Sequence, residues 1–242
     1  MRIVVVSATS LIAQHCIRLW AKTGEHEIVL VGRSKDKLES TKSDLGLRFP
    51  SSVFSIALVD FTSSQSIETF VEGVAAKPID IVLVAQGALT EQPKASKNLS
   101  YLKQQLELNA VSVAVVVEAF ASVLEKQGGG TLGVIGSVAG DRGRAYNYSY
   151  GASKSLIETY TQGLQQRFAG SKVSVSLIKP GPTATPMTSG HAGKMATPES
   201  VAGVIVSGLR SGRLVIYAPR FWEQIMFVVR CIPFWVFKHL KF

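Results

Sequence analysis

Residues 2–13 read RIVVVSATSLIA, which is an apolar, β-branched run followed by a turn rich in serine and threonine and by the start of a helical pattern. Three more short runs are apolar throughout, at Ile28–Val31, Ile81–Val84 and Leu132–Ile135. Such runs are typical of strands that are covered on both faces, as in a parallel sheet between two layers of helices. The opening segment and these three runs therefore predict an α/β fold.

The rest of the chain keeps this alternation, with helical patterns between the strand candidates. Thr197 followed by Pro198 is a helix-start signal, and Ser34 or Asp36 could cap the second helix. We expect a single Rossmann-type domain over residues 1–218, with a doubly wound, seven-stranded parallel sheet and helices on both faces. The strand candidates are Ile3–Ser7, Glu27–Val31, Val53–Leu58, Ile79–Ala85, Thr131–Ile135, Val173–Ile178 and Arg213–Ile216, and the helical segments are 12–22, 34–47, 64–75, 98–126, 147–169 and 198–210.

The composition fits a globular protein with a large core, because 46% of the 242 residues are hydrophobic and 18% are charged. Cys16 and Cys231 give neither a disulfide framework nor a metal-binding spacing, so we expect no metal. The net charge of +9 admits an anionic partner, but no basic tract or nucleic-acid motif accompanies it. Polar residues interrupt the apolar start too early for a signal peptide, which favours a cytoplasmic protein.

Four residues are candidates for catalysis. Tyr150 and Lys154 are four apart on a predicted helix and share one face, where the ammonium would lower the pKa of the phenol. Ser137 ends an apolar strand upstream, and its hydroxyl could bond the same carbonyl oxygen as the tyrosine. Asn109 interrupts an apolar helical stretch, which suits asparagine only if its amide has a partner. Taken singly, each also has an ordinary structural explanation.

Together, Asn109, Ser137, Tyr150 and Lys154 resemble the catalytic residues of the short-chain dehydrogenase/reductase family in their order and distances. The resemblance spans about residues 1–218. It implies an oxidoreductase in which the serine orients a substrate carbonyl and the tyrosine is the acid/base. The lysine would hold the cofactor ribose and tune the tyrosine, and the asparagine would fix a water in a proton relay. A homodimer or homotetramer through the helices of Asn109 and Tyr150 is also implied.

The first turn departs from the family pattern T-G-x-x-x-G-I-G, because Ser7, Leu11 and Ala13 stand where glycines are expected. Glycines there let the backbone approach the cofactor diphosphate. Ser7 and Ala13 are small, whereas Leu11 is the larger departure. The candidates for cofactor contact in this turn are Ser7, Thr9, Ser10 and Ile12.

Arg33 follows the second strand, where an NAD-dependent relative would carry an acidic residue. A guanidinium suits the 2′-phosphate, so we expect NADP(H), although a surface arginine at a helix start would look the same. His191 lies in an expected substrate lid, Ser189–Ala196, and is more simply an exposed residue. The resemblance places further cofactor contacts at Asp60, Phe61, Ala85, Gln86, Gly87, Pro180, Gly181, Thr183 and Thr185; Gln86 departs from the usual N-A-G.

The tail, residues 219–242, is dense in aromatic and basic residues, and its apolar window is too short to span a bilayer. Rings and cations together favour a peripheral contact with a membrane surface. Packing at an oligomer interface, or over an active site of a partner subunit, would explain the same residues. Both interpretations stay open.

Residues 141–144 (DRGR), residues 185–188 (TPMT) and the tail resemble the reductases that convert a decaprenylphosphoryl 2-keto-pentose (erythro-pentofuranosid-2-ulose) to decaprenylphosphoryl arabinose. This implies NADPH-dependent reduction of a ketone on a lipid-linked or amphipathic molecule, such as a polyprenyl-phosphate keto-sugar, at the inner face of a membrane. Arg142 and Arg144 could meet a substrate phosphate, or lie in a solvated loop. The alternatives are a soluble 3-oxoacyl reductase and a non-catalytic dinucleotide-binding or scaffold protein.

Overall fold

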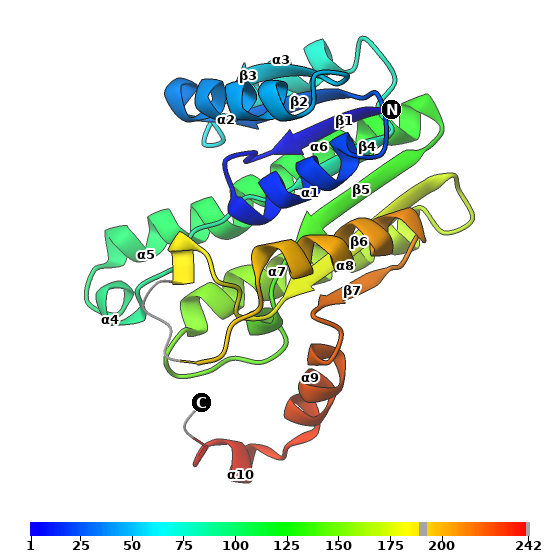
Figure 1. The fold of residues 1–242 in the computed structure, drawn as a ribbon. Coiled ribbons are helices and arrows are strands. Elements are labelled where there is room, and N and C mark those ends of the chain that lie inside the picture. The colour runs from blue at the N-terminus through cyan, green and yellow to red at the C-terminus, as the bar shows by residue number, and fades with distance from the viewer. Residues whose placement is uncertain (189–192, 241–242) are drawn as a thin grey trace.

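The computed structural model describes residues 1–188 and 193–240. Its seven strands form one all-parallel sheet in the order β3-β2-β1-β4-β5-β6-β7, with helices on both faces (Figure 1). This confirms the predicted doubly wound sheet. The strands are β1 (Arg2–Val6), β2 (Glu27–Gly32), β3 (Val53–Leu58), β4 (Ile81–Val84), β5 (Gly130–Ile135), β6 (Val173–Pro180) and β7 (Val215–Ala218).

The described helices follow the predicted segments, with three additions: a short helix after β4 and two helices in the tail. Thr197 caps its helix as expected, because its hydroxyl accepts the N–H of Ser200 at 3.2 Å. Ser34 precedes its helix, but among the described residues its side chain accepts no capping bond, and Asp36 lies within the first turn. The helices are α1 (Leu11–Ala21), α2 (Lys35–Arg48), α3 (Ser64–Val74), α4 (Gln92–Ala95), α5 (Leu99–Leu106), α6 (Ser112–Gln127), α7 (Tyr148–Arg167), α8 (Pro198–Arg210), α9 (Trp222–Cys231) and α10 (Phe234–Phe237).

Both faces of the sheet are buried because successive side chains of a strand point to opposite sides. In β1, Val4 and Val6 pack in a cluster with α3, α6 and α7, whereas Ile3 and Val5 pack in a second cluster with α1, α2 and α8. All four of these side chains are fully buried. The apolar runs found in the sequence are thus the central strands of a three-layer core.

The predicted helix 98–126 is interrupted by a π-helical turn, η1 (Glu107–Val111), between α5 and α6. The combined stretch Leu99–Gln127 is long and apolar enough to cross a membrane by length and composition. However, Val113, Val117 and Phe120 of α6 are buried in the core against the sheet. The apolar character of this stretch is therefore explained by its packing inside the domain.

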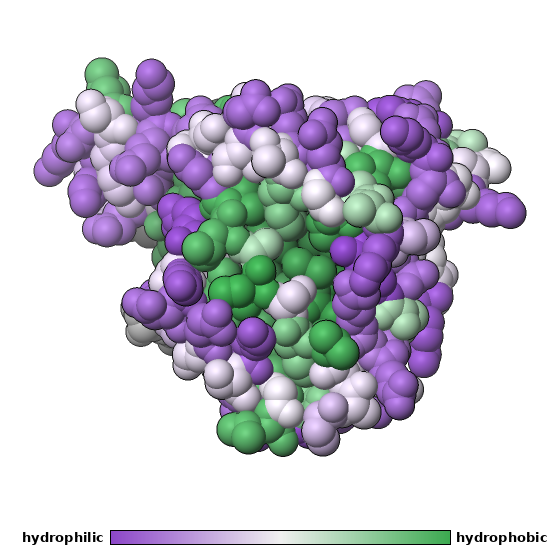
Figure 2. All heavy atoms as spheres, turned by 90° about the horizontal axis from the view of Figure 1, so that it is seen from above, coloured by the Kyte–Doolittle hydropathy of each residue, from purple (hydrophilic) through white to green (hydrophobic). Residues whose placement is uncertain are grey.

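Apolar side chains also reach the surface. Figure 2 shows one face on which hydrophobic residues gather in the middle and hydrophilic residues frame them. In the tail, which leaves the body after β7 (Figure 1), Phe234 and Trp235 are 73% and 70% exposed. Apolar surface that is gathered in this way is typical of a site that binds a ligand or another molecule.

Candidate active site

The structure brings Ser137, Tyr150 and Lys154 together on one cavity of about 1050 Å³. Ser137 follows β5, and the other two lie on α7. The cavity lies beside the carboxyl ends of β1, β4, β5 and β6, where open α/β sheets bind their ligands. Its lining also includes Ser10, Ile12, Ala85, Gln86, Gly87, Pro180, Gly181, Thr183 and Thr185, all of which were candidates from the sequence.

Lys154 is held in place by the ends of two strands. Its Nζ donates to the carbonyl oxygens of Ile135 at 3.1 Å and Gln86 at 3.4 Å, and it lies 5.8 Å from the centre of the Tyr150 ring. Because the side chain is buried, the pKa of Lys154 falls to about 8. The ammonium is therefore close to losing its charge within the range of ordinary assays.

Tyr150 keeps its proton at neutral pH. Burial raises the pKa of its phenol to about 12, while the neighbouring Ser137 hydroxyl acts in the opposite direction. The expectation that Lys154 lowers this pKa is wrong for this structure, since desolvation dominates and the ammonium is bonded to two carbonyls. A protonated phenol is the form that gives a proton to a carbonyl oxygen.

Ser137 presents its hydroxyl from an extended backbone at the end of β5. Its Oγ accepts the N–H of Ala139 at 3.1 Å and so caps the short helix η2 (Val138–Gly140). A hydroxyl that accepts such a bond keeps its own hydrogen to donate. The residue can thus be fixed by the backbone and still bond a substrate oxygen.

Asn109 lies in the π-helical turn and is fully buried. Its Oδ1 accepts the N–H of Ala88 at 2.7 Å, which is the partner that the sequence required. An added Cβ at Gly87 would lie 3.3 Å from this oxygen and 3.2 Å from Lys154 Nζ. Asn109 therefore holds the loop after β4 beside Lys154 and, among the described residues, is not part of the cavity lining. π-helical turns are frequent at functional sites.

The turn after β1 closes without glycine. Ser7 adopts a left-handed backbone with φ of 59°, and its carbonyl accepts the N–H of Ser10 at 2.9 Å. Ser10 precedes α1 as its N-cap residue, and both it and Ile12 line the cavity. Leu11 is half-buried and lies outside the described lining, and Thr9 is exposed. The first-turn N–H groups of α1 could hold a diphosphate.

Arg33 and Asp60 lie at the ends of the paired strands β2 and β3, and both are exposed. The Asp60 carboxylate accepts the hydroxyl and the N–H of Thr62; these bonds, with a smaller contribution from the nearby Arg33 charge, hold its pKa below the ordinary value. Phe61 was also predicted to contact the cofactor, and its side chain is buried in the core. Only its backbone could face a cofactor.

Gln86 lines the cavity, but its side-chain amide is bonded inside the protein. Its amide donates to Ser112 Oγ at 2.6 Å and to the Leu108 carbonyl at 3.3 Å, so its side chain lies inside the protein. What it offers the site is the carbonyl that receives Lys154. On the other wall, Thr183 donates to the Gly181 carbonyl at 2.9 Å.

Of the expected lid, His191 and residues 189–192 lie outside the described residues. Lys194, which follows them, is exposed and lines the cavity. On the wall before α7, Arg144 also lines the cavity, and its Nη1 donates to the Tyr146 hydroxyl at 3.2 Å. Cationic side chains from two loops thus border the cavity.

Arg142 does not face the cavity, which corrects the expectation that it could meet a substrate phosphate. Its guanidinium donates to the carbonyls of Val229 at 2.5 Å and Ile232 at 2.6 Å, at the end of α9. The tail in turn supplies four residues of the cavity lining, which sequence reasoning missed: Trp222, Ile225, Met226 and Val229. Their helical spacing was the signal that could have revealed a buried face.

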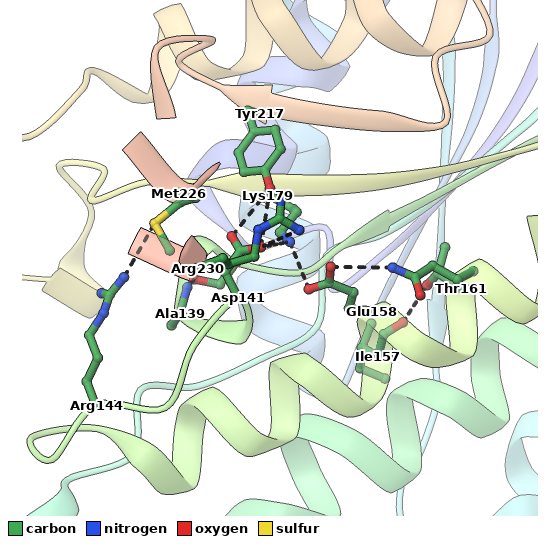
Figure 3. A network of polar contacts seen from close by, with 12 residues as sticks. Ala139, Asp141, Arg144, Ile157, Glu158, Thr161, Lys179, Tyr217, Met226 and Arg230 are labelled. Carbon is green, nitrogen blue, oxygen red and sulfur yellow. Dashed lines mark hydrogen bonds and ion pairs between the residues drawn. The ribbon is translucent and has the colours of Figure 1, made fainter. Parts of the chain in front are cut away.

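A buried ion cluster behind the cavity was missed as well. Lys179, at the end of β6 and 1% exposed, contacts the carboxylates of Asp141 at 2.5 Å and Glu158 at 2.8 Å. Figure 3 shows Asp141 between Lys179, Tyr217 and Arg230, and the Tyr217 hydroxyl donates to it at 3.2 Å. The only signal in the sequence was a lysine beside Pro180 at the end of an apolar strand.

Solved structures share this architecture. A short-chain dehydrogenase of Sphingobium yanoikuyae, solved in complex with NADPH, has a TM-score of 0.81 at 20% identity and covers 99% of this chain and 96% of its own. A short-chain dehydrogenase of Burkholderia cenocepacia in complex with NADP has a TM-score of 0.79 at 18% identity, with 96% and 98% covered. At these identities, the likeness concerns the fold.

Relatives with similar sequences are described as oxidoreductases. An uncharacterized oxidoreductase of Streptomyces coelicolor is 31% identical over 167 residues, which are 69% of this chain and 66% of the relative. Another, of Staphylococcus epidermidis, is 30% identical over 77% of this chain and 80% of its own length. The family model for short chain dehydrogenases matches residues 1–195. The chain therefore belongs to the short-chain dehydrogenase family of oxidoreductases.

Proposed function

We propose that this protein is an NADPH-dependent reductase that converts a ketone carried by an amphipathic molecule to an alcohol. The observation that carries the proposal is the single cavity on which Ser137, Tyr150 and Lys154 meet the first turn of α1. The residues for acid catalysis and the loops for a dinucleotide thus line the same cavity. Such a cavity suits a reaction between a bound cofactor and a small-molecule substrate.

Each residue has a role that its surroundings support. NADPH, when bound, supplies the hydride for the carbonyl carbon. Tyr150, protonated at neutral pH, gives its phenolic proton to the carbonyl oxygen, and Ser137 donates a hydrogen bond to the same oxygen. Lys154 carries its positive charge between the ends of β4 and β5 and would bond the cofactor ribose.

The residues at the cofactor end fit NADPH. Gly87, with φ of 157°, leaves room beside Lys154 that a side chain would fill, and the turn at Ser7 leads directly into α1. Arg33 is exposed at the end of β2, where a guanidinium can pair with a 2′-phosphate. The structural neighbours from Burkholderia and Sphingobium, which hold NADP and NADPH, support this choice.

The substrate end favours a bulky, partly apolar ketone. Trp222, Ile225 and Met226 of α9 form an apolar wall there, and Arg144 and Lys194 offer positive charge. A polyprenyl-phosphate keto-sugar combines these chemistries and is our proposed candidate. One structural neighbour, with a TM-score of 0.80, is described as a bulky-bulky ketone specific alcohol dehydrogenase of Comamonas testosteroni.

The tail would meet such a substrate at an anionic membrane surface on the cytoplasmic side. Phe227, Phe234 and Trp235 are exposed, and Arg220 and Lys238 accompany them. Aromatic rings and cations are the groups that bind the interfacial region of anionic bilayers. Separately, a homodimer or homotetramer would form through the helical segment that carries Asn109 and through α7, which carries Tyr150.

The test is a spectrophotometric assay of NADPH oxidation with ketones of increasing size. Tyr150→Phe should lower kcat by about a hundredfold or more, because it removes the proton donor. The same variant should bind NADPH as the wild type does. Full turnover by Tyr150→Phe would refute the mechanism, and recovery of the protein in the supernatant with phosphatidylglycerol vesicles, even without salt, would refute the membrane contact.

A further inference from the structure

The loop that follows Ser137 is anchored on one side and bonded to the tail on the other. Asp141 of this loop is fixed by the buried Lys179 and by the Tyr217 hydroxyl (Figure 3). The Arg230 guanidinium of α9 lies 4.0 Å from the same carboxylate. Asp141 therefore gives the loop a rigid base within the sheet and helix α7.

The next residue, Arg142, closes the end of α9. Its Nη1 donates to the carbonyls of Val229, Arg230 and Ile232, and its guanidinium carbon lies 3.8 Å from the centre of the Phe237 ring. The last carbonyls of a helix lack partners within the helix and carry its negative dipole end, so a cation there is stabilising. One side chain thus holds both α9 and α10.

On its inner side, α9 packs tightly against the cavity walls. No side chain larger than hydrogen fits at Gly181, because an added Cβ would collide with the Trp222 indole. Met226 is fully buried with Val138 and Tyr217, and its sulfur lies 3.5 Å from Arg144 Nη2. The tail therefore reaches both the wall after β6 and the loop after Ser137.

We propose that α9 is the wall that selects the ketone by the size of its apolar part, and that Arg142 is the positioning residue that holds this wall in place. The inference rests on the proposed function for the nature of the substrate. The inference goes beyond the proposed function because it assigns the choice of substrate to residues outside the dehydrogenase motifs. Without the Arg142 contacts, α9 would leave the cavity open on the substrate side while the cofactor side stays intact.

The first test follows the wall itself through tryptophan fluorescence. In a Trp235→Phe background, the remaining tryptophans are the buried Trp20 and Trp222, so acrylamide quenching reports mainly on Trp222. We expect Arg142→Ala to raise the quenching constant about twofold or more. Arg142→Lys should fall in between, because one ammonium cannot match the planar fork of a guanidinium. Arg220→Ala, which removes an exposed charge of the same tail, is the matched control.

The second test measures the pocket with prodan, an amphipathic aryl ketone whose emission shifts to shorter wavelength in an apolar site. Arg142→Ala should weaken prodan binding about tenfold, which corresponds to about 1.4 kcal/mol, and leave NADPH binding unchanged. Phe237→Leu should change the acrylamide quenching and the prodan affinity in the same direction, by a smaller amount. This variant also provides the test if Arg142→Ala does not fold.

The outcomes separate the two proposals. Wild-type quenching and prodan affinity in Arg142→Ala and Phe237→Leu would overturn the inference, and so would an equal effect of Arg220→Ala. If the enzyme turns over ketones, the loss in Arg142→Ala should appear in KM for long chains and not in kcat for short ones. Failure to reduce any ketone would refute the proposed function, whereas the fluorescence results would still decide the role of Arg142.

Discussion

Replacement of Lys179 by methionine tests whether the buried ion cluster holds the catalytic half of the domain together. The lysine is 1% exposed, and its Nζ lies 2.5 Å from Asp141 and 2.8 Å from Glu158. Methionine has a similar length but no charge, so in the variant the fully buried Asp141 carboxylate would lose the ammonium that neutralises it. Breaking a buried ion pair from one side costs about 3–5 kcal/mol.

This cost can be measured by urea unfolding and by thermal unfolding, both followed by circular dichroism. Since a domain of this size shifts by about 2–4 °C for each kcal/mol, the melting temperature should fall by about 6–20 °C. A triple variant, Lys179→Met with Asp141→Asn and Glu158→Gln, removes the stranded charges and should recover at least half of the loss. A single variant within about 1 kcal/mol of the wild type would refute the reasoning.

The pH dependence gives an independent check on the same side chain. Burial lowers the pKa of Lys179, but its bonds to the Asp141 and Glu158 carboxylates outweigh this effect and leave the pKa above the ordinary value. A raised lysine pKa stabilises the fold below the unfolded value of about 10.4, and this contribution is lost as the pH rises through the folded pKa. The difference between wild type and Lys179→Met should therefore shrink only above about pH 10.

Three further predictions concern Lys154, Arg33 and Ser7. The pKa of Lys154 is about 8, so kcat/KM for reduction should fall as the pH rises through that value, and Lys154→Arg should flatten this limb of the pH profile. Arg33→Gln should weaken NADPH binding about tenfold to a hundredfold in fluorescence titrations and leave NADH binding unchanged; an equal loss for both would show that Arg33 does not contact the 2′-phosphate. Ser7→Gly should relieve a left-handed backbone at a cost in chain entropy, for a net gain of up to about 1 kcal/mol in calorimetry, and a lower melting temperature would contradict this account.

The sheet could be predicted from the sequence because its information is local. A strand such as Ile81–Val84 is buried on both faces, and this requires an unbroken apolar run. The placement of Ser137 after β5, and of Tyr150 and Lys154 one helical turn apart, likewise follows from spacing along a single element. Local periodicity therefore predicted the elements and the residues that point from their ends.

The sequence could not show how the polar groups are partnered across elements. Lys154 is next to Tyr150 on α7, yet the carbonyls of Gln86 and Ile135 and the burial of both side chains decide the two pKa values. Similarly, the sequence pattern does not indicate that Ser7 has a left-handed backbone or that Asn109 lies in a π-helical turn. These properties depend on the tertiary structure around each residue.

Arg142 and Arg144 show this limit most sharply, because they are two residues apart in one loop and have the same chemistry. The tail returns to this loop from a separation of 87 residues or more and places the α9 carbonyls within reach of Arg142. Arg144 contacts the side of the same helix and remains on the cavity wall. A motif can therefore identify a loop as part of the site, but it cannot assign its two cations, since one binds the helix that forms the wall and the other faces the space that this wall encloses.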